Sequence, residues 1–296
     1  MMETNNIFNF KRFGKYFVSD LKTGVANYGL SLLALTVIAP LALECLTGVF
    51  NMILGVTWEG ADFGMRVGVF CVAMFCMLVT MPAKCYGKIT DKQYGAFWLM
   101  LPASRLEKFI SMLLICCIIA PVIGVAVYLG VDALICAIDP TCNQNIVAGS
   151  IDTIKELALR FNFGDVHVDV AQEDLMMVEN GLKFLKQITN PWLYVDEVLF
   201  ASLTFLLGAM CFKKGKIVKT FLAMAVLSIG MSMFAGPIMM AFSWDFMTVA
   251  NEEEAMKIMF ESGFYDKLIW LDIVGDALLY GGLIVAIWFR IKTLKH

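Results

Sequence analysis

Six stretches of this chain are apolar for long enough to cross a membrane, because a transmembrane helix needs about 20 mostly apolar residues. The stretches run from Tyr28 to Val49, from Met65 to Met81, from Ile110 to Gly130 (extendable to Ile138), from Val195 to Phe212, from Val218 to Phe242, and from Leu268 to Phe289. The pattern therefore predicts an all-α membrane protein with six transmembrane helices, forming one polytopic domain over residues 1–296.

Helical periodicity continues in the segments between these stretches. Residues 7–22 repeat aromatic and aliphatic side chains at helical spacing, with lysines on another face, which predicts an amphipathic N-terminal interfacial helix. Whether it is a general membrane anchor or an elbow packed on the bundle stays open. Residues 131–194 are predicted to form a helical insert of two or three short helices, and residues 250–262 a further one.

The composition agrees with a chain that folds in lipid. Hydrophobic residues make up 59% of it and charged residues 17%, with a mean hydropathy of +0.75, whereas soluble domains are about 45–50% apolar and about 25% charged. This excludes disorder, nucleic-acid binding and an ordinary cytosolic enzyme. The first apolar stretch is too long for a signal peptide and no small-residue cleavage pattern follows it, so we interpret it as an uncleaved span.

The basic residues are distributed unevenly along the chain, and this predicts an orientation. Four alternate segments hold 16 of the 23 lysines and arginines: Lys11, Arg12, Lys15 and Lys22; Lys84, Lys88, Lys92, Arg105 and Lys108; Lys213, Lys214, Lys216 and Lys219; Arg290, Lys292 and Lys295. Inside loops are enriched in lysine and arginine. We therefore expect a multi-pass protein of the cytoplasmic (inner) membrane of a bacterium, with both termini cytoplasmic and the 131–194 insert extracytoplasmic.

Motifs for covalent chemistry are absent from the sequence. It contains no H-E-x-x-H zinc motif, no G-x-S-x-G nucleophile and no G-x-x-x-x-G-K-[ST] phosphate loop, and its only histidines are His167 and His296. We expect no enzyme activity, no metal site and no cofactor in this chain. If ATP drives its function, another polypeptide must hydrolyse it.

Three of the acidic residues within predicted spans are candidates for a functional site. Glu44 lies in the outer part of the first span, and Asp272 and Asp276 share one face of the sixth. Charge inside a membrane suggests function by default, so these residues form a candidate intramembrane polar site for a proton or cation. We favour the alternative that they lie near the outer boundary and face water, because no matching histidine or cation is evident in the spans opposite.

Two of the nine cysteines, Cys136 and Cys142, flank Asp139 and Pro140 on the predicted external side. An oxidising compartment would allow a disulfide across this turn. Two free thiols remain the alternative.

The loop between the second and third spans is both basic and aromatic. It carries Phe97 and Trp98, and Ser104 is followed three residues later by Glu107, which is the spacing of a helix-initiating capping box. We predict that the third helix starts at Ser104 and that a short helix lying against the membrane precedes it. An ordinary capped helix start is the plainest reading of this pattern.

The same loop resembles the type-2 permease family of ATP-binding-cassette transporters. Members often carry a leucine-proline-x-serine-arginine-x-glutamate-like run between spans two and three, matched here by Leu101, Pro102, Ser104, Arg105 and Glu107. The predicted N-terminal helix, six spans and internal termini also match. The chain departs from the family in its large insert after span three, since the family more typically has its larger external element between spans five and six.

The resemblance implies a permease subunit, acting as a homodimer or heterodimer, that exports a substrate by alternating access. ATP would be bound and hydrolysed by a separate ATP-binding-cassette ATPase subunit. Residues 84–108 would be the coupling segment on which this ATPase docks, and the residues expected to transmit force are Phe97, Trp98, Leu101, Pro102, Ser104, Arg105 and Glu107. Two alternatives remain: a non-transporting assembly or sensor protein that binds a partner through its external helices, and an ion-coupled carrier using Glu44, Asp272 and Asp276.

Overall fold

The computed structural model describes residues 8–142, 144–160, 191–247 and 264–293, which are helical and contain no strand. The helices are α1 (Phe10–Leu33), α2 (Ala39–Ile53), α3 (Phe63–Cys85), α4 (Lys92–Met100), α5 (Arg105–Leu113), α6 (Ala120–Ile138), α7 (Ile146–Arg160), α9 (Pro191–Cys211), α10 (Lys216–Met247) and α12 (Phe264–Thr293). A π-helical segment, Ala34–Ile38, joins α1 to α2, and another, Leu114–Ile119, joins α5 to α6.

Several of these helices are long and apolar enough for a multi-pass membrane protein. Five candidate spans are found in the described residues: Phe10–Ile53, Phe63–Thr90, Arg105–Ile138, Lys216–Met233 and Ile273–Thr293. They contain or overlap the first, second, third, fifth and sixth predicted stretches. The fourth stretch lies in α9, a 21-residue helix that is not among the five. Six spans and their orientation therefore remain predictions.

The N-terminal helix is not a separate element. Asn9 caps α1 by accepting a hydrogen bond from the backbone N–H of Lys11, and α1 then continues through residues 22–28 without a break. The predicted division between an interfacial helix at 7–22 and a span starting at Tyr28 is wrong. The reason is a single apolar stripe, formed by Phe17, Leu21, Tyr28, Leu32 and Leu35, that stays in helical phase across this junction and packs on the core.

Both π-helical segments precede an alanine-proline pair. Pro40 and Pro121 occupy the second positions of α2 and α6, where a proline cannot donate a backbone hydrogen bond to the preceding turn. A wider π turn accommodates that loss and is a frequent cause of local helix bending. The first and third predicted spans are therefore interrupted at defined points.

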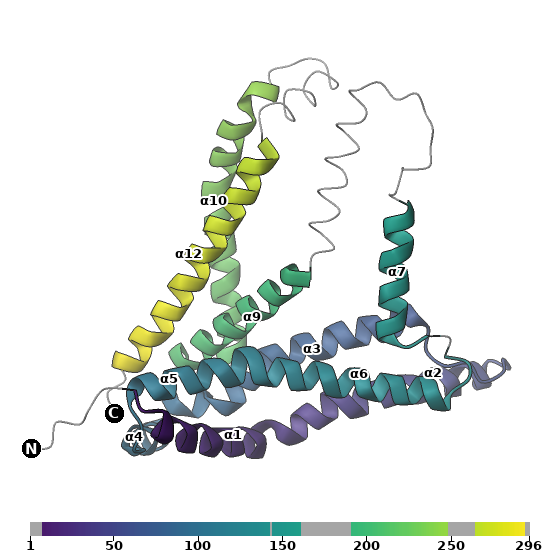
Figure 1. Ribbon diagram of the computed structural model, residues 1–296, viewed down its shortest axis with the longest axis horizontal. Coiled ribbons are helices and arrows are strands. Elements are labelled where there is room, and N and C mark those ends of the chain that lie inside the picture. The colour runs from purple at the N-terminus through teal and green to yellow at the C-terminus, as the bar shows by residue number, and fades with distance from the viewer. Residues whose placement is uncertain (1–7, 143, 161–190, 248–263, 294–296) are drawn as a thin grey trace, which may run out of the picture.

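Figure 1 shows the arrangement of the helices. The α1–α2 helix, α3 and the α5–α6 helix form a layer, and α10 and α12 rise away from it. α9 packs against α3, α10 and α12 and so connects the two parts. Fully buried apolar side chains lie along this connection: Met77, Met112, Leu206, Met210, Ile287 and Ile291.

The α9–α10 hairpin depends on two glycines. Gly215 turns the chain with a φ of 62°, a left-handed conformation that favours glycine. Gly208 faces Thr220, and a Cβ at residue 208 would lie 2.8 Å from the Cβ of Thr220. The rings of Phe205 and Phe221 meet edge to face beside this contact, with centroids 5.0 Å apart. Small residues allow such close helix approach in membranes.

We expect Gly208→Ala to destabilise the protein by about 1–3 kcal/mol, because the added methyl group must push α9 and α10 apart. The matched control is Gly230→Ala in α10, where nothing lies within 4 Å of the new Cβ. Thermal unfolding of both variants in detergent provides the measurement. A Gly208→Ala melting temperature equal to that of the control would contradict the proposed contact.

Candidate functional site

In the segment 84–108, the second helix, α5, starts at the predicted position after Ser104. The Ser104 hydroxyl accepts a hydrogen bond from the Glu107 backbone N–H at 3.2 Å, and the Ser104 backbone N–H donates to Glu107 Oε2 at 2.9 Å. This reciprocal pair is the capping box, and α5 starts at Arg105. The predicted helix start is confirmed.

Glu107 does more than cap its own helix. Its carboxylate accepts hydrogen bonds from Arg12 Nε at 2.9 Å, from Arg12 Nη2 at 2.8 Å and from the Asn9 backbone N–H at 3.0 Å. The Glu107 side chain is fully buried, while that of Arg12 is 36% exposed. Buried carboxylates persist when they are paired and hydrogen-bonded. Glu107 therefore fastens the start of α1 to the start of α5, and it has no surface to offer a partner.

Lys108 fixes α4 against α5. Its ammonium group donates to the backbone carbonyls of Trp98 at 2.7 Å and Leu99 at 3.2 Å, satisfying carbonyls that the end of α4 would leave unpaired. It also lies 4.9 Å from the centroid of the Trp98 ring, a cation–π distance. Both side chains are almost completely buried. Trp98 is therefore part of the internal support and not of an exposed docking face.

Two further contacts join residues 84–108 to the C-terminal half. The Lys216 ammonium group, at the start of α10, donates to the Gly87 carbonyl and to the Thr90 hydroxyl, the latter at 3.1 Å. Arg105 Nη1 donates to the Lys292 carbonyl in the last turn of α12 at 3.1 Å. Residues 87–108 thus contact α1, α10 and α12 through named polar groups. We call this set of contacts, with those of Glu107 and Lys108, the hub.

An additional carboxylate near the hub was missed by sequence reasoning. Asp20 Oδ2 in α1 accepts hydrogen bonds from the Tyr86 hydroxyl at 3.0 Å and from the Ser111 hydroxyl at 2.6 Å. Asp20 follows Phe17 by three residues and precedes Leu21, so it stands beside the apolar stripe of α1. A carboxylate beside an apolar stripe needs polar partners, and this position in the sequence could have identified Asp20 as part of a buried polar contact.

The residues expected to transmit force differ in exposure: some lie on the surface of the hub and others are buried within it. Phe97 is 62% exposed and the neighbouring Met100 is 82% exposed. Leu101 is half-buried, and Pro102 and Arg105 are exposed. Phe97 and Met100 therefore form an apolar pair on the surface of a rigidly held helix.

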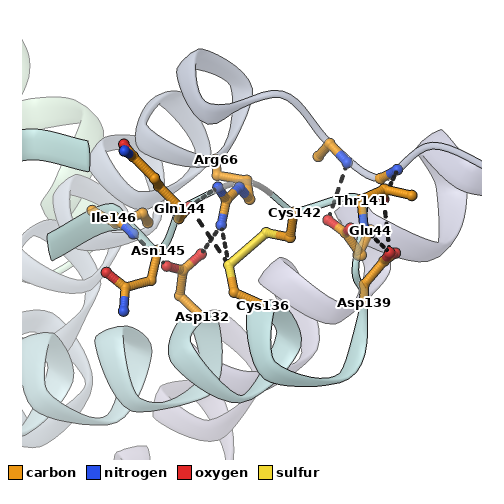
Figure 2. Close-up of a disulfide and its surroundings, with 12 residues drawn as sticks. Glu44, Arg66, Asp132, Cys136, Asp139, Thr141, Cys142, Gln144, Asn145 and Ile146 are labelled. Atoms are coloured by element: carbon orange, nitrogen blue, oxygen red, sulfur yellow. Dashed lines mark hydrogen bonds and ion pairs between the residues drawn. A yellow bond between two sulfur atoms is a disulfide. The ribbon is translucent and has the colours of Figure 1, made fainter. Parts of the chain in front are cut away.

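At the opposite end of the bundle lies a second polar cluster, shown in Figure 2. Arg66 in α3 and Asp132 in α6 form an ion pair of 3.0 Å, with side chains 5% and 2% exposed. Asp132 Oδ2 also accepts from the Ile146 backbone N–H at 2.7 Å, at the start of α7. Arg66 further donates to the Gln144 carbonyl and to Cys136 Sγ. Arg66 therefore places a cation at the start of the second predicted span, where it pairs with Asp132, which was not among the three acidic candidates.

Glu44 joins this end of the bundle to the α2–α3 loop. It is buried, and its Oε2 accepts from the Ala61 backbone N–H at 3.2 Å. Nearby, Trp58 Nε1 donates to Asp139 Oδ2 at 2.6 Å, and the Gly60 backbone N–H donates to the Thr141 hydroxyl at 3.0 Å. The hydrogen bonds from Trp58 and Thr141 hold the pKa of Asp139 below its ordinary value. These contacts pin the 54–62 loop to the turn after α6.

The two cysteines of the predicted bridge lie in this cluster. Cys136 and Cys142 form a disulfide, with Cα atoms 5.0 Å apart. It closes the turn between α6 and α7 beside the buried Arg66–Asp132 pair. Of the other acidic candidates, Asp272 and Asp276 lie in α12. Asp276 is partly buried, and the Asp272 side chain lies outside the described residues.

The described residues contain no group of three or more histidine, cysteine or acidic side chains able to hold a metal ion. They contain instead an anchored, partly apolar segment at one end of the bundle and a polar cluster held by hydrogen bonds at the other.

No family model, curated protein or solved structure matches this chain.

Proposed function

We propose that this chain is the permease subunit of an ATP-driven exporter and that a separate ATPase subunit docks on the hub. The sequence resemblance at Leu101, Pro102, Ser104, Arg105 and Glu107 suggests this function and the outward direction. The observation that carries the proposal is the hub itself. A docking segment can drive a bundle only if it is fixed to several helices, and residues 87–108 are fixed to α1, α10 and α12.

In this mechanism the ATPase pushes on the exposed Phe97–Met100 surface of α4. The force passes through Lys108 to α5 and through Glu107 to α1, because both links are buried and made of charged groups. The π-helical segments before Pro40 and Pro121 provide points at which the first and third spans can bend. Repeated bending would alternate the access of a substrate pathway between the two sides, in a dimer of permease subunits.

We expect Phe97→Ala/Met100→Ala to reduce recovery of the ATPase at least tenfold, since exposed apolar anchors carry much of an interface's affinity. The measurement is affinity purification of the tagged chain from its native host in mild detergent, with quantification of copurifying phosphate-loop proteins. The control is Phe289→Ala/Met231→Ala, which removes equally exposed side chains from α12 and α10. Recovery of no ATPase with the wild-type chain would refute the proposal.

A second candidate function is partner binding through α7, without transport. One observation favours it: α7 is anchored by Asp132 and the disulfide turn, while Val147 and Ile151 on it are 46% and 47% exposed. In that case Val147→Asp/Ile151→Asp would abolish partner recovery while Phe97→Ala/Met100→Ala would leave it unchanged. The same purification thus separates the two functions.

A further inference from the structure

A basic groove runs between α1 and the turn that follows α4. It has a volume of about 490 Å³ and is lined on the α1 side by Asn9, Lys11, Arg12, Lys15, Tyr16 and Ser19, and on the other by Leu101 and Pro102. This volume lies within the range of about 300–1,000 Å³ that is usual for small-molecule sites. The groove is therefore large enough to hold a compact polar group.

Three of its lining residues are cations, and two of them are not used by the fold. Arg12 is engaged with Glu107, but Lys11 and Lys15 are exposed and form no ion pair within the described residues. Tyr16 is 9% exposed and its hydroxyl is buried, so it lines the groove without offering a donor to it. Ser19, which also lines the groove, is exposed. The groove thus combines positive charge with the Ser19 hydroxyl, which suits an anion bearing several acceptor oxygens.

The two polar clusters indicate where the groove lies relative to the membrane. Arg66 and Tyr86 are 20 residues apart along α3, and Ser111 and Asp132 are 21 residues apart. At 1.5 Å per residue, these separations are about 30 Å, which is the thickness of a bilayer's hydrocarbon core. The polar clusters around Asp132 and Asp20 therefore mark the two boundaries of that core.

The cations of the groove lie just beyond the Asp20 boundary. Lys15 and Lys11 precede Asp20 by 5 and 9 residues on the same helix, or by about 8 and 13 Å along its axis. Polar headgroups occupy about 5–8 Å outside the hydrocarbon core on each side. Lys15 therefore lies at their outer edge, and Lys11 reaches back to them through its long side chain. The exposed Phe10 ring on α1 is 81% accessible and lies next to Lys11, so apolar surface adjoins the charge.

We infer that this groove binds the headgroup of an anionic phospholipid, with its phosphate between Lys11, Lys15 and the Ser19 hydroxyl. The basic charge supplies the attraction to anionic lipid. Because the far wall is Leu101 and Pro102, a bound lipid bridges α1 and the coupling segment and adds to the contact that Glu107 makes beneath it. The lipid site does not depend on the transport function, and it would exist in a non-transporting protein as well.

The test measures lipid binding to the full chain in detergent by native mass spectrometry, comparing phosphatidylglycerol with phosphatidylcholine of the same acyl chains. We expect the wild-type protein to bind phosphatidylglycerol at least fivefold more tightly. Lys11→Gln/Lys15→Gln should reduce this preference to less than twofold. Lys213→Gln/Lys214→Gln, which removes the same charge from exposed positions in the α9–α10 turn, should retain it.

The wild-type protein supplies two further comparisons that need no variant. Raising salt from 0.1 M to 1 M shortens the Debye length from about 10 Å to about 3 Å and should weaken the preference. Inorganic phosphate alone should give less than a tenth of the thermal stabilisation given by phosphatidylglycerol at equal concentration. Equal binding of both lipids, an equal loss in both lysine pairs, salt-independent binding, or equal stabilisation by phosphate would each overturn the inference.

Discussion

Replacing Glu107 with alanine is expected to lower the free energy of unfolding by about 2–4 kcal/mol, because it breaks an ion pair whose carboxylate is buried and leaves two backbone donors without their acceptor. The substitution removes the carboxylate that pairs with the Arg12 guanidinium and accepts hydrogen bonds from the backbone N–H groups of Asn9 and Ser104. It therefore loosens two helix starts at once. The start of α1 should separate from α5, although the rest of both helices remains packed on the core.

Denaturation in mixed detergent micelles measures this loss, and hydrogen exchange locates it. Faster exchange should be confined to the first turns of α1 and α5. Glu197→Ala, which removes an exposed carboxylate from α9, is the control and should change stability by less than about 0.5 kcal/mol. If Glu107→Ala were as mild as that control, Glu107 would not be the link between α1 and the hub.

A double-mutant cycle separates the pair from its surroundings. Arg12→Met alone should lower the free energy of unfolding less than Glu107→Ala. Arg12 is partly exposed, and in the Arg12→Met variant the Glu107 carboxylate still accepts hydrogen bonds from the backbone N–H groups of Asn9 and Ser104. If the two residues stabilise each other, the double variant will be less destabilised than the sum of the single ones. Additive effects would show that Glu107 acts through the backbone donors alone.

Several structural features followed directly from the sequence. Long apolar runs predicted an all-helical chain, and the spacing of Ser104 and Glu107 predicted the capping box at the start of α5. Both depend on local periodicity, which a single chain displays openly. The division between an N-terminal helix and the first span was not predictable in the same way, since it required recognising that the stripe through Phe17, Leu21 and Tyr28 keeps its phase.

The polar contacts of the site were largely beyond sequence reasoning. Arg12 and Glu107 are 95 residues apart, and Arg66 and Asp132 are 66 apart, so no local pattern pairs them. Glu107 was expected among the force-transmitting residues, and it is buried with hydrogen bonds to Arg12 and Asn9 of the α1 start. The charge of such residues is visible in a sequence, but their burial depends on how the helices pack. Phe97 was expected among the force-transmitting residues, and the structure shows that its side chain is exposed on α4.

Replacing Arg66 with methionine is expected to destabilise the opposite end of the bundle by about 3–5 kcal/mol, because it leaves the Asp132 carboxylate buried with one partner, the Ile146 backbone N–H. The effect should reach α7, whose first turn Asp132 holds, and should appear as faster hydrogen exchange over residues 144–153. Arg66→Met/Asp132→Leu removes both charges and should be more stable than Arg66→Met, since apolar pairs of similar volume commonly replace buried ion pairs at little cost.

A double variant that is more stable than the single Arg66→Met variant distinguishes a buried ion pair from two residues that merely lie close together. Arg66 also donates to the Gln144 carbonyl and to Cys136, so the double variant will not recover wild-type stability fully, and exchange at Gln144 should remain fast. Asp152→Leu, which removes a half-exposed carboxylate of the exposed Lys155 ion pair on α7, is the control and should change stability by less than about 1 kcal/mol. If Arg66→Met/Asp132→Leu were less stable than Arg66→Met, the carboxylate would have to be stabilised by the backbone of α7 more than by Arg66. The pinned cluster would then be built around Asp132 alone.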